Sequence, residues 1–154
     1  MGEIQKKLEK FGVAVTGLKA GTTYKFTYKL GAKVDNAKKS ARHSKKAAEH
    51  AKKGHAALKQ VKETMKAGDF GAARAMFQSA SGLSDEIKSC VEDAEQFAQR
   101  ADEDWQKAAG SLKQAYETAK KGAEEAFKHA GKLLGAYEDL ARSVGAALEE
   151  HAAR

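Results

Sequence analysis

The sequence predicts an all-α protein, a bundle of long alanine-rich helices that follows a short N-terminal β-hairpin. Three observations lead to this class: 31 of the 154 residues are alanine, there is no proline, and apolar residues recur at helical spacing over most of the chain. Leu, Ile, Val and Phe together number only 24, so the core depends on small side chains. We expect a single domain over 1–154, divided into segments 1–32, 33–67 and 69–154.

The N-terminal segment changes its pattern near Phe11. Ile4, Leu8 and Phe11 lie at helical spacing and predict a short amphipathic helix in the first ten residues. After Phe11 the apolar residues alternate with small and polar ones, which predicts a hairpin that pairs 11–17 with 22–30. An isolated hairpin is marginally stable, so we expect it to pack on the chain's own helices, extend another subunit's sheet or enter a partner. Its aromatic contact residues are Tyr24, Phe26 and Tyr28.

The segment 33–67 predicts a basic helix, with Asp35 or Asn36 as its cap and Gly68 as its end. A seam of mostly small residues repeats along it and predicts close helix packing: Val34, Ala37, Ala41, Ser44, Ala48, Ala51, His55, Leu58 and Met65. His55 is the histidine of this seam that we expect to titrate at a contact. The remaining surface is rich in lysine, and we expect it to bind a partner through Lys38, Lys39, Arg42, Lys45, Lys46, Lys52 and Lys53.

The charge distribution leaves three kinds of partner open for the basic helix. Residues 1–67 carry 17 Lys and Arg against 5 Asp and Glu, whereas 68–154 carry 11 against 16. Nucleic acid binding would be non-specific, because the helix has little arginine and no interleaved aromatic residues. An anionic membrane surface suits a basic helix, but an alanine face inserts weakly. We favour protein contact, with the acidic segment 85–104 of the same chain or of a neighbouring copy.

The segment 69–154 predicts helices over 69–80, 84–109 and 111–152, with a turn at 79–84. An eleven-residue repeat aligns 94–137 in four segments, and this period gives an almost straight stripe along a helix. Its glycines predict a break near Gly110 or between Gly131 and Gly135. The aromatic residues of the repeat are the expected self-association contacts: Phe97, Trp105, Tyr116 and Phe127.

The eleven-residue period of this repeat, and no other feature of it, is similar to the amphipathic repeats of exchangeable apolipoproteins, phasins and late-embryogenesis proteins. The resemblance covers 94–137 and implies a helix that opens onto lipid or onto another surface. The repeat positions are mostly alanine, which favours packing of helix against helix over insertion into lipid.

No motif in the sequence indicates an enzyme, a cofactor or a metal. Phosphate-binding glycine loops are absent, the five histidines form no Glu-x-x-His motif, and Cys90 has acidic neighbours and no nearby histidine. The single cysteine needs no oxidising compartment, so the cytoplasm is the expected location. There is neither a long apolar stretch nor a signal-peptide core, although export without a classical signal stays open.

From these patterns we expect a non-enzymatic structural or interaction protein, a self-associating homo-oligomeric bundle with a basic contact face. The alternative is a lipid-associating, membrane-associating or membrane-inserting helical protein in which the aromatic hairpin acts as a β-tongue.

Overall fold

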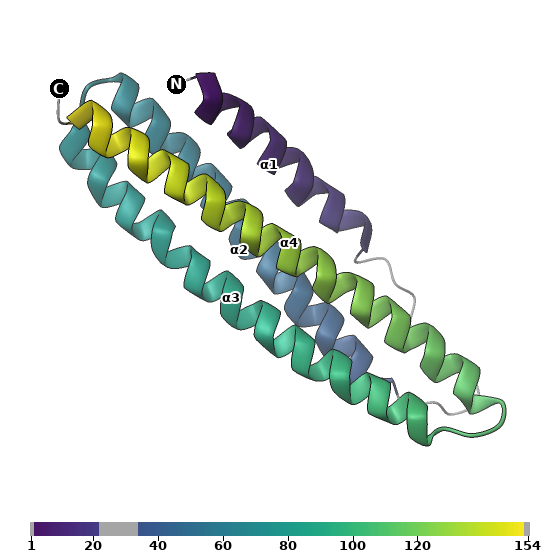
Figure 1. Ribbon diagram of the computed structural model, residues 1–154. Helices are drawn as coiled ribbons and strands as arrows, with labels where there is room; N and C mark the ends of the chain where they lie inside the picture. Colours follow the sequence, from purple (N-terminus) through teal and green to yellow (C-terminus); the bar gives the residue numbers. More distant parts are fainter. Residues whose placement is uncertain (1, 22–33, 153–154) are drawn as a thin grey trace.

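Four helices form the computed structural model, which describes residues 2–21 and 34–152. They are α1 (Gly2–Gly21), α2 (Asp35–Lys66), α3 (Phe70–Lys107) and α4 (Leu112–Ala152). The last three run up and down as a long bundle in which each contacts the other two. α1 lies against α4 and α2 along one half of this bundle (Figure 1). The predicted all-α class and the helical bundle are therefore confirmed.

Two glycines reverse the chain between the long helices. Gly68 has φ +84° and joins α2 to α3, and Gly110 has φ +63° and joins α3 to α4. Glycine adopts positive φ at little cost, which explains both positions. Asp69 caps α3, because its Oδ1 accepts a hydrogen bond from the backbone N–H of Ala72 at 3.1 Å. The break expected near Gly110 is confirmed, and α4 continues through Gly131 and Gly135.

The predicted β-hairpin is wrong in its first strand, because 11–17 belongs to α1. The alternation at Val13 and Val15 suggested a strand, but the spacing of four from Phe11 to Val15 continues the helical face. Phe11 and Val15 pack on the core, whereas Val13 is 73% exposed. Its second strand, 22–30, with Tyr24, Phe26 and Tyr28, lies outside the described residues. No strand occurs within 2–21 or 34–152.

The turn predicted at 79–84 is also wrong, because α3 passes through it without interruption. Ser84 Oγ donates to the carbonyl of Ser81 at 2.8 Å, so the hydroxyl is satisfied inside the helix. Ala73 and Ile87 are fully buried on the two sides of this segment, and Ala80 is fully buried within it. Packing of this apolar face outweighs the turn preference of serine and glycine.

The eleven-residue repeat does not form one stripe in the fold. Its second segment, 105–115, contains the turn between α3 and α4, so Trp105 ends one helix and Tyr116 lies in the next. The positive φ of Gly110 reverses the chain there, and a straight helical stripe cannot continue through such a turn. Ala119, Ala123 and Ala130 are nevertheless buried within α4.

The core consists of two clusters along the bundle. The larger lies where α1 joins the other helices and is built around Leu8, Leu58, Ile87, Tyr137 and Leu140. The smaller lies toward the turn between α3 and α4 and is dominated by alanine: Val34, Ala37, Ala98, Ala101, Ala119 and Ala123. The end of the bundle without α1 is therefore held together by small residues that bury little area each.

Tyr137 is the largest fully buried side chain and packs on the backbone of α2. A Cβ atom placed on Gly54 would lie 2.5 Å from Tyr137 Cζ, so only glycine fits there without movement. The Tyr137 hydroxyl donates a hydrogen bond to the carbonyl oxygen of Ala80. This one ring thus connects α4 with both α2 and α3.

The substitution Gly54→Ala tests this contact. Alanine favours helix, but here its methyl group would displace the Tyr137 ring, and we expect the free energy of unfolding to fall by about 1–3 kcal/mol. Gly135→Ala is the matched control, since nothing lies within 4 Å of a Cβ at Gly135. It should raise stability by up to about 1 kcal/mol. Urea unfolding followed by circular dichroism measures both, and equal effects would contradict this packing.

Burial raises the pKa of Tyr137 to about 12. The neutral hydroxyl is therefore favoured in the folded state, and its contribution to stability is complete below the ordinary tyrosine pKa near 10. Between about pH 10 and 12 the unfolded chain ionises first, so stability should fall with rising pH. Tyr137→Phe should remove part of this slope in urea titrations across that range. An unchanged slope would show that Tyr137 is not the group responsible.

Candidate interaction surfaces

The outward side of α2 carries the basic residues predicted from the sequence. The inward positions are mostly small or apolar, among them Ala37, Ser40, Ala47, Ala51 and Leu58. Because a helix has two opposite sides, the residues between these positions point outward. We define the basic face as the exposed side chains of Lys39, Arg42, Lys45, Lys46, Lys52 and Lys53. Lys38, which was predicted with them, is half-buried.

The basic face is not neutralised by the rest of the described structure. Within 2–21 and 34–152, none of its side chains makes an ion pair with a described carboxylate. Lys62 of the same helix is, in contrast, buried. It donates to Gln5 Oε1 and its Nζ lies 3.4 Å from Glu63 Oε1, because α1 covers this part of α2.

Histidines of α2, and not its lysines, lie close to the acidic residues of α3. His43 Nδ1 lies 3.9 Å from Asp93 Oδ2, and His50 Nδ1 lies 3.2 Å from Glu86 Oε2. The half-buried Cys90 is on the same side of α3, and burial together with the nearby Asp93 raises the pKa of its thiol. Within the described residues, the acidic segment 85–104 makes no ion pair with Lys39, Arg42, Lys45, Lys46, Lys52 or Lys53 of α2.

Phe97 lies at this α2–α3 contact and is half-buried. The His43 ring stacks on it with a centroid distance of 5.5 Å and an interplanar angle of 1°. Lys39 Nζ and Arg100 Cζ lie 5.4 and 5.1 Å from the centroid of the Phe97 ring, within the range of cation–π attraction. Phe97, predicted as a self-association residue, thus takes part in the packing of its own chain.

Trp105 has a similar place at the far end of the bundle. Lys113 Nζ and Lys120 Nζ lie 5.0 and 3.8 Å from the centroid of its ring. Lys120 also pairs with Asp102 Oδ1 at 2.9 Å, and this contact lowers the pKa of Asp102 and raises that of Lys120. The ionised pair links α3 to α4, with the indole ring beside it.

The remaining predicted contacts, Tyr116 and Phe127, are half-buried against the smaller core cluster. The structure therefore separates the four aromatic residues: Phe97 meets α2, Trp105 meets α4, and Phe127 lines a groove. None of the four is fully exposed.

This groove runs between α3 and α4 and has a volume of about 640 Å³. Its acidic residues are Glu95, Asp102 and Glu103 from α3 and Glu124 from α4, and Lys128 is the one cation among its lining residues. Phe127 and Ala98 provide its apolar surface. We call it the acidic groove. The sequence revealed its α3 carboxylates, but Glu124 joins them only because the chain reverses at Gly110.

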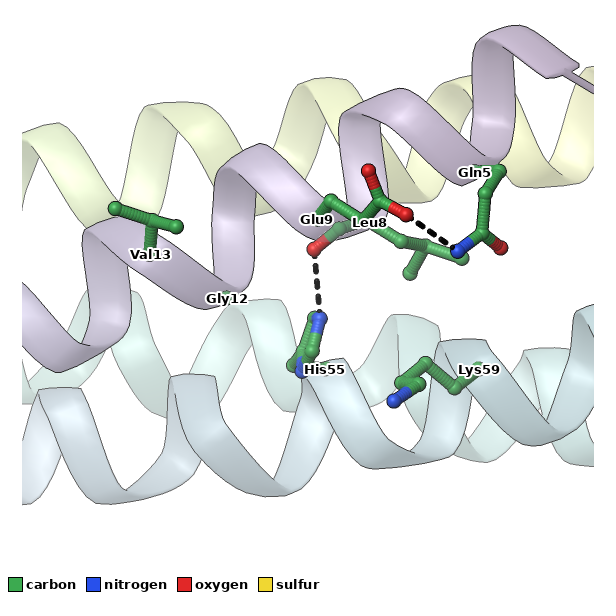
Figure 2. Close-up of a pocket in the computed structure, with 7 residues that line it drawn as sticks. All are labelled: Gln5, Leu8, Glu9, Gly12, Val13, His55 and Lys59. Atoms are coloured by element: carbon green, nitrogen blue, oxygen red, sulfur yellow. Dashed lines mark hydrogen bonds between the residues drawn. The ribbon is translucent and has the colours of Figure 1, made fainter.

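A second groove, of about 370 Å³, lies between α1 and α2 (Figure 2). His55 points from α2 toward α1, and its Nε2 lies 2.7 Å from the carbonyl oxygen of Leu8. The His55 ring also packs on Phe11 and beside Gly12. His55 therefore attaches α1 to the bundle, as a contact residue of the seam on which the sequence placed it.

Within the described part of the chain, no three His, Cys, Asp or Glu side chains are grouped in a way that could hold a metal ion. None of the helices described here has a stretch apolar and long enough for a membrane span. No protein-family model, curated protein or solved structure matches this chain. The fold and these surfaces define its class, a helical bundle with a basic face and an acidic groove.

The packing role of Phe97 can be separated from a role in assembly. Phe97→Ala removes the ring that His43, Lys39 and Arg100 contact, and should lower the free energy of unfolding by about 1–2 kcal/mol. Val13→Ala, at an exposed site on α1, should change it by less than about 0.5 kcal/mol. Thermal and urea unfolding give both values. Unchanged stability of Phe97→Ala, together with a lower assembled mass by light scattering, would instead assign Phe97 to an interface between copies.

Proposed function

We propose that the chain is a non-enzymatic interaction protein, a self-associating helical bundle that uses the basic face of α2 to bind acidic protein surfaces. One observation carries this proposal: the basic face is exposed along α2 and no described carboxylate pairs with it. Concentrated charge of one sign on a rigid helix speeds and orients association with a surface of the opposite sign.

The small apolar area that the alanine-rich core buries also supports self-association. The end of the bundle near Gly110 is packed mainly by alanines, which contribute little hydrophobic stabilisation each. Association of copies buries further surface and stabilises the folded state by mass action. We keep a cytoplasmic location within the proposal, because the single Cys90 requires no disulfide.

A second candidate is binding to an anionic membrane surface, which α1 favours. α1 is amphipathic: Ile4, Leu8 and Phe11 are buried, while Lys6 and Lys10 are exposed. A helix of this kind can lie in a membrane interface if it leaves the bundle. The first strand of the predicted β-tongue, 11–17, is part of α1, so this candidate depends on α1 and the basic face instead.

Charge reversal on the basic face tests the proposal. Light scattering over a concentration series should give a mass above the monomer for the wild type, falling as salt is added. Lys45→Glu combined with Lys52→Glu should weaken association roughly tenfold or more, because like charges then oppose each other at the interface. Lys6→Glu combined with Lys10→Glu changes the net charge equally on α1 and should leave association unchanged.

The same samples decide between the two candidates when anionic vesicles are added. A wild type that stays monomeric at every concentration and sediments with the vesicles would overturn the first proposal and favour the membrane. A wild type that assembles in the absence of lipid and does not sediment with vesicles supports it.

A further inference from the structure

The two oppositely charged surfaces lie on opposite sides of the bundle. α2, α3 and α4 pack against one another pairwise, so each of these helices faces the groove between the other two. The buried residues of α2 point toward α3 and α4, and its basic face points away from them, except that Lys39 reaches the Phe97 ring of α3. The acidic groove opens between α3 and α4 on the far side. The basic face and the acidic groove of one molecule therefore cannot meet each other.

The grooves between the three long helices are not equivalent. α1 lies against α4 and α2, and so covers part of the groove between them. The α2–α3 contact contains the ring stack of His43 on Phe97 and the pairs of His43 with Asp93 and His50 with Glu86. No described helix covers the α3–α4 side, where α1 makes no contact with α3. That side can accept a helix from outside.

We infer that the acidic groove between α3 and α4 binds the basic face of α2 from a second copy of this chain, so that copies associate head to tail. This inference rests on the proposed function and names the surface that meets the basic face. Each molecule contributes a different patch to each contact, so the interface is heterologous, and such interfaces build open chains or rings.

The spacing of the charges agrees with this pairing. Lys45 and Lys52 are seven residues apart on α2, about 10.5 Å along a helix, and the exposed Glu95 and Glu103 are eight residues apart on α3, about 12 Å. Glu103 and Glu124 add negative charge on the two walls of the groove, and Phe127 offers an apolar contact for the lysine stems. A helix in this position would lie against two helices of the bundle, as α1 lies against α4 and α2.

The test is a charge exchange between two variants. The first, Lys45→Glu with Lys52→Glu, makes the α2 face less basic; the second, Glu95→Lys with Glu103→Lys, reverses exposed charges of the groove. Each variant alone should show association at least roughly tenfold weaker than the wild type by light scattering or sedimentation velocity. An equimolar mixture should assemble more strongly than either variant alone, because the introduced glutamates of one variant then meet the introduced lysines of the other, and the native basic face meets the native groove.

A second measurement tests the head-to-tail geometry. The first variant keeps a native groove, so it can bind the basic face of one wild-type molecule but cannot extend the chain further. Small amounts added to the wild type should therefore lower its mean mass, whereas Lys6→Glu with Lys10→Glu should not. Circular dichroism confirms that each variant is folded, and the single substitutions Lys52→Glu and Glu103→Lys replace any double variant that is not.

The outcomes distinguish this inference from the proposed function. A wild type that assembles, with a groove variant that assembles equally well, would overturn the inference and leave self-association through another surface. Variants that each dissociate without recovery on mixing would also overturn it. A wild type that is monomeric at all concentrations would overturn the self-association itself.

Discussion

The small side chains on the inner face of α2 determine how closely the three long helices approach one another. Ser40, Ala47 and Ala51 are fully buried there, and the Tyr137 ring lies directly on Gly54. Ser40 Oγ donates to the Ala94 carbonyl at 2.6 Å, which brings α3 equally close. Since small residues bury little area each, the bundle gains stability from helix length and from α1, whose Ile4, Leu8 and Phe11 complete the larger core.

This close packing also determines where the charges lie. With the inner face of α2 occupied by small residues, its lysines and Arg42 can only point outward, apart from Lys62 beneath α1. The carboxylates of α3 likewise lie outside its inner face, because Ala94, Ala98 and Ala101 occupy that face. The α2–α3 contact then forms through serine, histidine and Phe97, and the basic face of α2 makes no ion pair with the carboxylates of α3.

Repetition along single helices could be predicted from the sequence, whereas arrangement between helices could not. The end of α2 at Gly68 and the reversal at Gly110 were evident from local patterns, and six of the nine predicted seam residues are buried. The strand predicted at 11–17 and the turn at 79–84 failed because tertiary packing outweighed local preference, through Phe11 and Val15 in one case and Ala80 and Ile87 in the other. Only the α3 carboxylates of the acidic groove could be predicted from the sequence. Glu124 is distant in sequence from Glu95, and the fold brings the two together.

The position of α1 gives the bundle unequal sides. At 20 residues, α1 reaches about 30 Å along an α4 of 41 residues that extends about 61 Å, so it covers roughly half the length of the groove it joins. It brings Ile4, Leu8 and Phe11 to that groove, and these apolar residues explain why α1 binds where Leu58 and Leu140 are buried. The α3–α4 side has carboxylates around a single aromatic ring instead. A helix suited to that side must carry cations on long flexible stems, and α2 has more exposed lysines than any other described helix.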